Sequence, residues 1–389
     1  MKKMKKLLLS ALTITALTFT SCSNDDNNNN TPSNQPTADN LVGSLTGELR
    51  LANNGTDYEL KGRLYVKDGG TLIIEPGVTI KAVAGGTDVF IMVEKGGRIN
   101  ADGTAANPIK FTSNATNPVA GDWGGLILNG KAPLSRQSGS NSNAATEVDA
   151  NIFFGGDLPQ DNSGILNYVI LEYTGARIDD ESEHNGLTLN GVGNRTIVSN
   201  IFIKNGDDDA IEFFGGTVNA SNILVVNAKD DMFDYTQGYT GTCTNLYGIR
   251  EAAYTAVTSD PRGIEADGNL DGNTPTDINQ SVFTINNITI IHNGGIDLTD
   301  AIKIRRGATS TITGAYVAAG TSSTFSDFID LEDSKGNATS ATTITVVGNS
   351  ANGLNIEDNK NTPAATINAT NGTTGSVSTS LFTWTGYFN

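Results

Sequence analysis

The chain has 389 residues, of which 37% are hydrophobic, 7% aromatic and 17% charged, against roughly 25% charged residues in an average globular domain. Gly supplies 44 residues, and 42 acidic residues face 25 basic ones. This composition excludes a helical bundle or coiled coil, which needs many Ala, Leu, Glu, Lys and Arg residues. The acidic balance argues against nucleic acid and anionic lipid as partners, because both are bound through clustered Lys and Arg.

The first residues have the organisation of a bacterial secretory signal peptide. A basic start precedes an apolar run over residues 7–19, which is too short to span a membrane. The following Phe19-Thr20-Ser21-Cys22 resembles the lipobox of bacterial lipoproteins, in which the Cys becomes the lipidated N-terminus. The acidic and Asn-rich residues 23–30 resemble the surface-export signal of Bacteroidota lipoproteins. We therefore expect a signal peptide over residues 1–21, a lipid on Cys22 as the membrane anchor, and the protein on the outer face of the outer membrane.

A tether and one folded domain are expected after this leader. Beyond the leader the chain carries 21 basic and 42 acidic residues, a net charge of −21. The segment over residues 22–40 lacks large apolar side chains and is expected to form a disordered tether, with the folded domain over residues 41–389. With Cys22 acylated, Cys243 has no disulfide partner, and we expect it to fill the core or a turn.

The folded domain contains a repeat. Short runs of β-branched residues alternate with Gly, Asn and Asp, a pattern typical of many short strands. Seven segments align without gaps, and their starts lie 22 to 38 residues apart. A minimum near 22 with variable insertions suits a parallel β-helix, because each coil must complete one turn while loops bulge between strands. The segments are residues 185–190, 209–214, 231–236, 262–267, 300–305, 327–332 and 352–357.

Two kinds of stacked position follow from this alignment. The third and fifth residues of every segment are apolar, Tyr235 among them, and strand alternation turns both inward. An Asn precedes an apolar residue in four successive coils, and at a spacing of roughly 4.8 Å these amides can hydrogen-bond as an internal asparagine ladder. Unrelated surface turns would not keep the next apolar residue in step, so the sequence predicts a parallel β-helix rather than a pair of β-sandwiches. The ladder residues are Asn200, Asn222, Asn245 and Asn287.

Three motifs add a family resemblance. They are residues 69–81, 121–133 and 208–218, the last of which reads Asp-Asp-Ala-Ile-Glu-Phe-Phe-Gly-Gly-Thr-Val. Together they resemble a family of secreted or lipid-anchored β-helix proteins from Bacteroidota, to which no activity is firmly attached. The resemblance implies that the all-β fold is a single-stranded right-handed parallel β-helix, a solenoid. We expect an N-terminal cap near residues 41–66 and a closing strand at residues 376–388.

Outward-facing positions of the aligned segments carry a column of charges. Glu212, Asp234 and Glu265 occupy the fourth position of three successive segments, so stacking places them on one face about 4.8 Å apart. Lys303 and Arg305 follow on the next coil. Carboxylates this close raise one another's pKa or recruit a cation. This column is the strongest functional signal in the sequence.

Aspartate pairs before two adjacent coils form a candidate metal site. Asp208 and Asp209 precede one strand, and Asp230 and Asp231 precede the next, so four carboxylates are expected to converge. Ca²⁺ prefers such hard oxygen ligands and is the cofactor that the sequence suggests. The alternative is that each aspartate accepts backbone N–H bonds of its own turn, a common use of Asp in turns.

The preferred functional hypothesis is non-catalytic binding, at the cell surface, of an extended polysaccharide or of a partner protein in an outer-membrane complex. The lateral face of a β-helix is long and flat, which suits a polymer. Phe214, Tyr239 and Tyr247 lie next to the acidic coils, where sugars stack on aromatic rings, and Asp267 extends the acidic face. Each ring has an alternative role in packing the core or a loop.

The alternative hypothesis is a polysaccharide lyase or glycoside hydrolase that uses the same carboxylate column with Lys303 or Arg305. Carboxylates about 5 Å apart suit retaining hydrolysis, whereas a lyase would combine Ca²⁺ with an Arg or Lys base such as Arg262. Residues 206–211 are similar to the Gly-Asp-Asp catalytic strand of β-helical polygalacturonases, but the sequence has no Gly-His-Gly. The resemblance to such enzymes is therefore partial.

Overall fold

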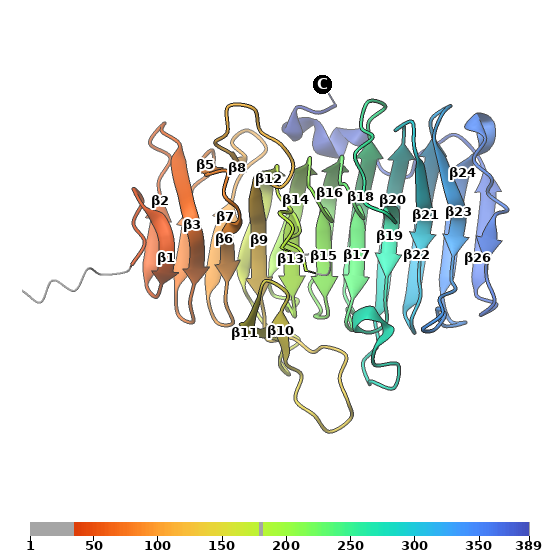
Figure 1. The fold of residues 1–389 in the computed structure, drawn as a ribbon, viewed down its shortest axis with the longest axis horizontal. Helices are drawn as coiled ribbons and strands as arrows, with labels where there is room; N and C mark the ends of the chain where they lie inside the picture. Colours follow the sequence, from red (N-terminus) through yellow and green to blue (C-terminus); the bar gives the residue numbers. More distant parts are fainter. Residues whose placement is uncertain (1–34, 179–181, 389) are drawn as a thin grey trace, which may run out of the picture. The chain divides into compact units, whose positions relative to one another are not determined.

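The computed structural model describes residues 35–178 and 182–388, and nearly all of this part of the chain is strand and turn (Figure 1). One sheet has 24 strands, whose pairings are parallel, while β10 (Ala144–Thr146) and β11 (Asp149–Phe154) form a separate antiparallel hairpin. The chain winds as a right-handed parallel β-helix, which confirms the predicted all-β solenoid. The expected signal peptide, the lipidation site at Cys22 and most of the expected tether lie outside the described residues.

The N-terminal strands are already part of the solenoid. Residues 41–66, which were expected to form a cap, contain β1, β2 and β3, and β3 pairs in parallel with β1, β5 and β6. These strands extend the parallel ladder, so the residues expected to cap the solenoid form its first coils. The strands are β1 (Leu41–Leu45), β2 (Glu48–Leu51), β3 (Tyr58–Val66), β4 (Thr71–Ile74), β5 (Thr79–Ala82), β6 (Gly86–Val93), β7 (Arg98–Asp102) and β8 (Ile109–Ser113).

Two columns of parallel strands run through the following coils, and we name them the site column and the ladder column. The site column consists of β9 (Trp123–Asn129), β13 (Leu187–Asn190), β15 (Ile211–Phe214), β17 (Phe233–Thr236), β19 (Arg262–Ala266), β21 (Asp297–Lys303), β23 (Thr324–Asp330) and β25 (Asn359–Lys360). The ladder column consists of β12 (Gly164–Glu172), β14 (Ile197–Lys204), β16 (Ala220–Val226), β18 (Thr242–Arg250), β20 (Val282–His292), β22 (Thr309–Ala319), β24 (Thr343–Asn349) and β26 (Thr366–Asn371). A short 3-10 turn, η1 (Leu270–Gly272), lies between β19 and β20.

Stacked aromatic rings fill part of the core. The ring centroids of Phe213 and Tyr235 lie 5.0 Å apart, and those of Tyr235 and Phe283 lie 4.6 Å apart. These rings are buried, as are the third and fifth residues of the first six aligned segments, because strand alternation turns them inward. Offset aromatic stacking adds to the free energy gained from burial. The predicted inward position of Tyr235 is confirmed.

The seventh aligned segment, residues 352–357, is out of register. The alignment predicted that Ile329 of β23 pairs with Leu354. In the structure, Ile329 pairs instead with Asn359 of β25. A 3-10 turn, η2 (Ser350–Asn352), and Gly353 at a φ of 91° occupy the start of this coil and delay the strand. The register prediction is therefore wrong for this coil, although six segments stack as expected.

The asparagine ladder is present in the ladder column. The Nδ2 atom of Asn222 donates to Oδ1 of Asn200 at 3.1 Å, that of Asn245 to Asn222 at 3.0 Å, and that of Asn287 to Asn245 at 3.3 Å. The column continues to Asn167, which accepts from Asn200 at 2.8 Å. The four predicted ladder residues all have positive φ, between 53° and 63°, which Asn tolerates better than other residues with a side chain.

Replacement of Asn222 separates the hydrogen bonds of the ladder from its backbone geometry. We expect Asn222→Ala to destabilise the fold by about 2–4 kcal/mol, because it loses two amide bonds and forces Ala into the left-handed region. Asn222→Gly loses the same bonds but accepts the positive φ, so its loss should be about half as large. Urea denaturation followed by circular dichroism measures both. Equal losses for the two variants would contradict the backbone contribution.

The C-terminal segment does not extend the sheet. It forms a 3-10 helix, η3 (Thr379–Thr385), which packs beside the middle strands of the ladder column (Figure 1). Phe382 is fully buried in a cluster with Ile170, and the hydroxyl of Ser376 donates to the carbonyl of Ile288 at 3.0 Å. The prediction of a closing strand at residues 376–388 is therefore wrong. The aromatic side chains of this segment cover an apolar stripe on the outer face of the ladder column.

Candidate functional site

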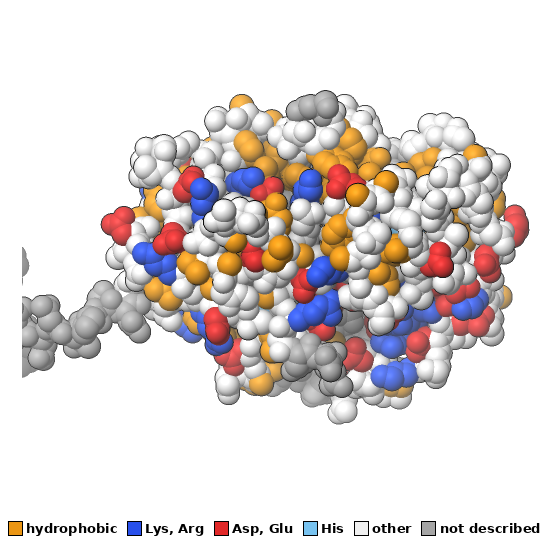
Figure 2. Space-filling view, turned by 45° about the horizontal axis from the view of Figure 1, so that its top comes forward, with side chains coloured by type: hydrophobic (Ala, Val, Ile, Leu, Met, Phe, Trp, Pro, Cys, Tyr) orange, Lys and Arg blue, Asp and Glu red, His pale blue; other side chains and the backbone are white. Residues whose placement is uncertain are grey.

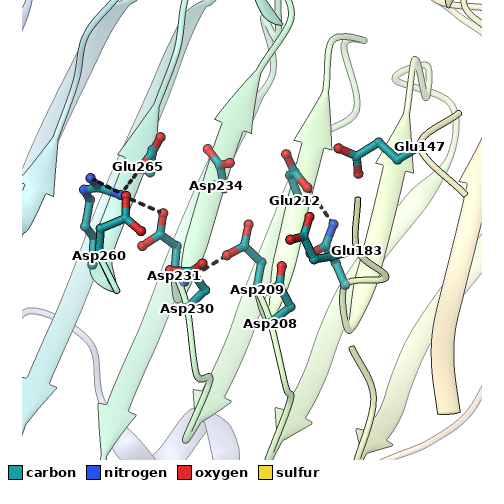
Figure 3. Close-up of a pocket in the computed structure, with 12 residues that line it drawn as sticks. Glu147, Glu183, Asp208, Asp209, Glu212, Asp230, Asp231, Asp234, Asp260 and Glu265 are labelled. Atoms are coloured by element: carbon teal, nitrogen blue, oxygen red, sulfur yellow. Dashed lines mark hydrogen bonds and ion pairs between the residues drawn. The ribbon is translucent and has the colours of Figure 1, made fainter. Parts of the chain in front are cut away.

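Adjacent strands of the site column hold the three predicted carboxylates in register. Glu212 of β15 pairs across the sheet with Asp234 of β17, and Asp234 pairs with Glu265 of β19. Their sequence neighbours point into the core, so these three side chains point outward and lie along one face (Figure 3). The predicted carboxylate column is therefore present in the structure.

The predicted aspartate pairs lie at the start of the same strands, directly beside this column (Figure 3). The Oδ1 atom of Asp209 accepts the backbone N–H of Asp231 at 2.8 Å, so this turn residue ties its coil to the next one. Asp208 accepts from the Arg177 guanidinium at 2.6 Å. Asp230 accepts from the Thr258 hydroxyl at 2.7 Å. The structure thus brings the expected metal ligands and the carboxylate column together.

The carboxylates line a cavity of about 180 Å³ and not an open flat face. Glu212 and Glu265 are each only 8% exposed, although the sequence suggested an exposed position. Segments inserted between strands of the site column add Glu147, Glu183 and Asp260 to the rim, which explains the difference. We call this space the acidic cavity. It is lined by Glu147, Glu183, Asn185, Asp208, Asp209, Glu212, Asp230, Asp231, Asp234, Asp260, Arg262 and Glu265.

Four lining residues were missed by the sequence reasoning. Glu147 lies between β10 and β11, Glu183 precedes β13, and Asp260 precedes β19, so none of them occupies an aligned position. Asn185 is the first residue of an aligned segment, but it was not predicted to be a site residue. The available signal was that insertions beside the acidic coils are themselves acidic.

Burial raises the pKa of the innermost carboxyl groups. For Asp209, Glu212 and Asp231, the loss of hydration and the charge of neighbouring carboxylates hold the pKa well above its usual value near 4. For Asp208, burial and the nearby Asp230 raise the pKa to about 8. At neutral pH these groups must keep protons or be neutralised by a cation.

One cation of the chain, Arg262, is among the residues that line the acidic cavity. Its Nε donates to Asp300 at 3.0 Å and its Nη2 to Asp260 at 3.2 Å. It also forms ion pairs with Glu265 and, at 3.9 Å, with Asp231. Its charge is therefore shared among four carboxylates.

Cations of the chain neutralise the acidic residues of later coils. Lys303 pairs with Asp330 at 2.5 Å, and Arg305 pairs with Glu265 and, at 2.8 Å, with Asp267. The candidate base Lys303 is therefore directed away from the acidic cavity, and Arg305 reaches only its Glu265 end. Asp267, a candidate ligand contact, is held by ion pairs. Figure 2 shows acidic and basic side chains mixed over the visible face.

The three candidate stacking rings lie in packed surroundings. Tyr239 is fully buried and packs in the core against Phe213, with the two rings tilted and their centroids 4.7 Å apart. Phe214 is buried in a small cluster with Leu134. Tyr247 contacts Phe382, at 6.1 Å between centroids, beneath the C-terminal segment. The expected open position of these rings is corrected, because covering segments and the core use their faces.

Some buried oxygens of the acidic cavity have no hydrogen-bond partner among the described residues. They are Oδ1 of Asn185, Oδ1 of Asp231 and Oδ1 of Asp234. Two groups of three residues in this cavity each place one oxygen per residue within 4.8 Å of one another. The first group is Asp208, Asp209 and Asp230, and the second is Asp209, Glu212 and Asp234. A third group, outside the cavity, is Asp300, Asp327 and Asp330.

The fold and the cavity define a class: a parallel β-helix with a carboxylate-lined cavity on its lateral face. Residues 43–388 match the family described as the pectate-lyase like beta helix domain, and the chain belongs to this family. No curated protein matches the sequence. In residues 35–178 and 182–388, no helix is both long and apolar enough to cross a bilayer.

Among solved structures, the crystal structure of Dettilon tailspike protein (gp208) is similar. The identity is 12%, the TM-score is 0.22, and the match covers 81% of this chain. The match covers 62% of the tailspike chain, so this protein spans less than two thirds of its length.

Proposed function

We propose that the protein is a calcium-dependent, non-catalytic glycan-binding lipoprotein of the bacterial cell surface. The observation that carries the proposal is the charge imbalance of the acidic cavity, where ten carboxylates surround a single arginine. The lipid anchor at Cys22 and the outer-membrane location belong to the proposal and rest on the resemblance of the leader to bacterial lipoproteins.

A comparison within the chain supports a bound cation. On the later coils, Lys303 and Arg305 neutralise neighbouring carboxylates, whereas Glu212 and Asp234 form no ion pair with a Lys or Arg of the described residues. Ca²⁺ takes six to eight oxygen ligands at roughly 2.3–2.6 Å, and carboxylate and amide oxygens are its usual protein ligands. A bound Ca²⁺ would supply to the early coils the positive charge that the chain supplies to the later ones.

A neighbouring cavity supports a glycan as the ligand. It has a volume of about 410 Å³ and shares Glu183, Asp230 and Asp260 with the acidic cavity. Arg177, Lys229, Val257, Thr258 and Ser259 complete its lining. Such hydroxyl and charged groups suit sugar hydroxyls, and a cation at the shared wall can take oxygens of a ligand into its coordination shell.

One observation favours a hydrolase instead. Oxygens of Glu212 and Asp234 lie within 4.8 Å, which is near the separation of carboxyl groups in retaining glycosidases, about 5–5.5 Å. Both groups, however, lie behind the rim, and Glu212 accepts a 2.5 Å hydrogen bond from Asn185. A sugar ring must lie between the two catalytic carboxyl groups, and the packing of this pair supports the non-catalytic proposal.

The test is a panel of acidic and neutral polysaccharides, scored for retention of the protein and for release of products. We expect retention in Ca²⁺, loss of retention in chelator, and no products. The double variant Glu212→Gln with Asp234→Asn should lose calcium-dependent retention. The control Asp88→Asn, at an exposed ion pair with Arg63, should retain it.

Other outcomes overturn the proposal in distinct ways. Products that the double variant no longer releases would establish the enzyme. Retention that is indifferent to chelator would refute the role of calcium. No retention on any glycan, combined with capture of an outer-membrane protein complex, would replace the glycan with a protein partner.

A further inference from the structure

We propose that the acidic cavity binds two divalent cations side by side, with Asp209 as the shared ligand. The first site is formed by Asp208, Asp209 and Asp230, and the second by Asp209, Glu212 and Asp234. The proposal rests on the calcium dependence proposed above and assigns Glu212 and Asp234 to metal binding, away from catalysis.

The distances within each group fit one cation per group. Two ligands of one Ca²⁺ at roughly 2.3–2.6 Å from the ion can be at most about 5.2 Å apart. The oxygens in each group lie within 4.8 Å of one another, so a common centre lies at most about 2.8 Å from each, and a shift of a few tenths of an ångström brings all three to the Ca²⁺ distance. Ions that share a carboxylate in two-metal sites lie roughly 3.5–4 Å apart, which the two carboxylate oxygens of Asp209 can bridge.

Unpaired buried oxygens provide an independent sign of a ligand. Asn185 lines the acidic cavity and is 1% exposed. Its Nδ2 donates to Glu212, so its own Oδ1 takes no part in that hydrogen bond. That Oδ1 has no hydrogen-bond partner among the described residues, and neither has Oδ1 of Asp231, which is 4% exposed. A buried oxygen without a donor costs about 1–3 kcal/mol, and a cation removes that cost.

The charge distribution favours two ions over one. A single cation at Asp208, Asp209 and Asp230 would leave Glu212 and Asp234 facing each other on adjacent strands. A cation at the second site alone would leave the turn carboxylates to cations of the chain: Arg177 at Asp208, Arg262 at 3.9 Å from Asp231, and the buried Arg250, which donates to the carbonyl of Asp230. Each group therefore needs a charge of its own.

The third acidic group of the chain shows what a compensated cluster looks like. Asp300, Asp327 and Asp330 also have oxygens within 4.8 Å of one another. Here Arg262 pairs with Asp300 at 3.0 Å, Lys303 with Asp330 at 2.5 Å, and Lys360 with Asp327 at 2.7 Å. Three cations of the chain occupy the space around this group, so we assign no metal to it.

The ligand chemistry selects a hard divalent cation. All five proposed ligand residues are carboxylates, without His or Cys, and this favours Ca²⁺ over Zn²⁺ or Cu²⁺. Mg²⁺ demands a near-ideal octahedron at roughly 2.0–2.1 Å and keeps several waters. A site assembled from two turns and two strands suits the more flexible coordination of Ca²⁺.

Native mass spectrometry and titration calorimetry of the full chain with Ca²⁺ count the ions. We expect two in the wild type, one in Asp208→Asn and one in Glu212→Gln, and at least a tenfold loss of affinity at both sites in Asp209→Asn. The matched control is Asp327→Asn, in the compensated group, which should keep two ions. These substitutions remove repulsion in a buried cluster, so the variants should fold, and thermal melting verifies this.

The outcomes separate this proposal from the previous one. If the wild type binds one ion and glycan retention is sensitive to chelator, the two-cation proposal is wrong and the proposed function stands. If both Asp208→Asn and Glu212→Gln abolish ion binding altogether, the carboxylates form one site, and the two-cation proposal is again wrong. Absence of any bound ion overturns both proposals.

Discussion

In buffer free of divalent cations, the melting temperature should fall as the pH rises from about 6.5 to 8.5, and saturating Ca²⁺ should remove most of this fall. The pKa of Asp208 is raised to about 8, and burial with the charge of neighbouring carboxylates also raises the pKa of Asp209 and of Glu212 well above the unfolded values near 4. The folded state then binds more protons than the unfolded state, so stability decreases with pH. The free-energy loss should be on the order of several kcal/mol.

The pH window is set by the two histidines. Burial lowers the pKa of His184 and His292 to about 4, so these groups make stability rise with pH between about 4 and 6.5. Above that range they are neutral in both states, and the carboxyl groups dominate the slope, joined near pH 8.5 by the thiol of Cys243, whose pKa burial raises to about 11. Melting curves at half-unit pH steps, with chelator and with Ca²⁺, measure the effect. A melting temperature that rises with pH above 6.5 in chelator would contradict the prediction.

Arg262→Gln should destabilise the cation-free protein by about 3–5 kcal/mol, because it removes one partner of a buried ion-pair network. The guanidinium is shared by Asp300, Glu265, Asp260 and Asp231, which would be left with less positive charge. Saturating Ca²⁺ should restore part of the loss, and the affinity for Ca²⁺ should increase. Chemical denaturation with and without Ca²⁺, together with calorimetry, measures both effects.

The matched control for Arg262 is Arg50→Gln, at a surface ion pair with Glu75. Exposed ion pairs contribute roughly 0–1 kcal/mol, so this variant should stay close to the wild type with or without Ca²⁺. If Arg262→Gln behaves like the control, the buried network does not hold the acidic cavity together.

Features that recur once per coil were predictable from the sequence. The inward positions of Phe213 and Tyr235 and the column of Glu212, Asp234 and Glu265 follow from one alignment, because parallel stacking repeats each position in the coil above. The ladder of Asn222 and its neighbours followed from the same regularity. The turn aspartates joined the column because their position before each strand is also repeated.

Features outside the repeat were not predictable in this way. The burial of Glu212 depends on insertions that carry Glu147 and Asp260, and an alignment of coils says nothing about where an insertion folds. Tyr239 lies beyond the six aligned positions of its coil, so its direction had no template. At the C-terminus a closing strand was predicted, but the sequence could not reveal the apolar stripe that receives Phe382.

The position of η3 has a consequence for the cooperativity of unfolding. In a solenoid each coil contacts only its neighbours, so the terminal coils can open one after another from the end. Here Ser376 contacts Ile288 of β20, and Trp384 of η3 contacts Tyr168 of β12, so the C-terminal segment reaches back past several coils from the last strand, β26. The C-terminal coils form a closed loop of chain, and detachment of η3 must precede or accompany their opening. A linear repeat array thereby acquires a long-range contact that couples its end to its middle.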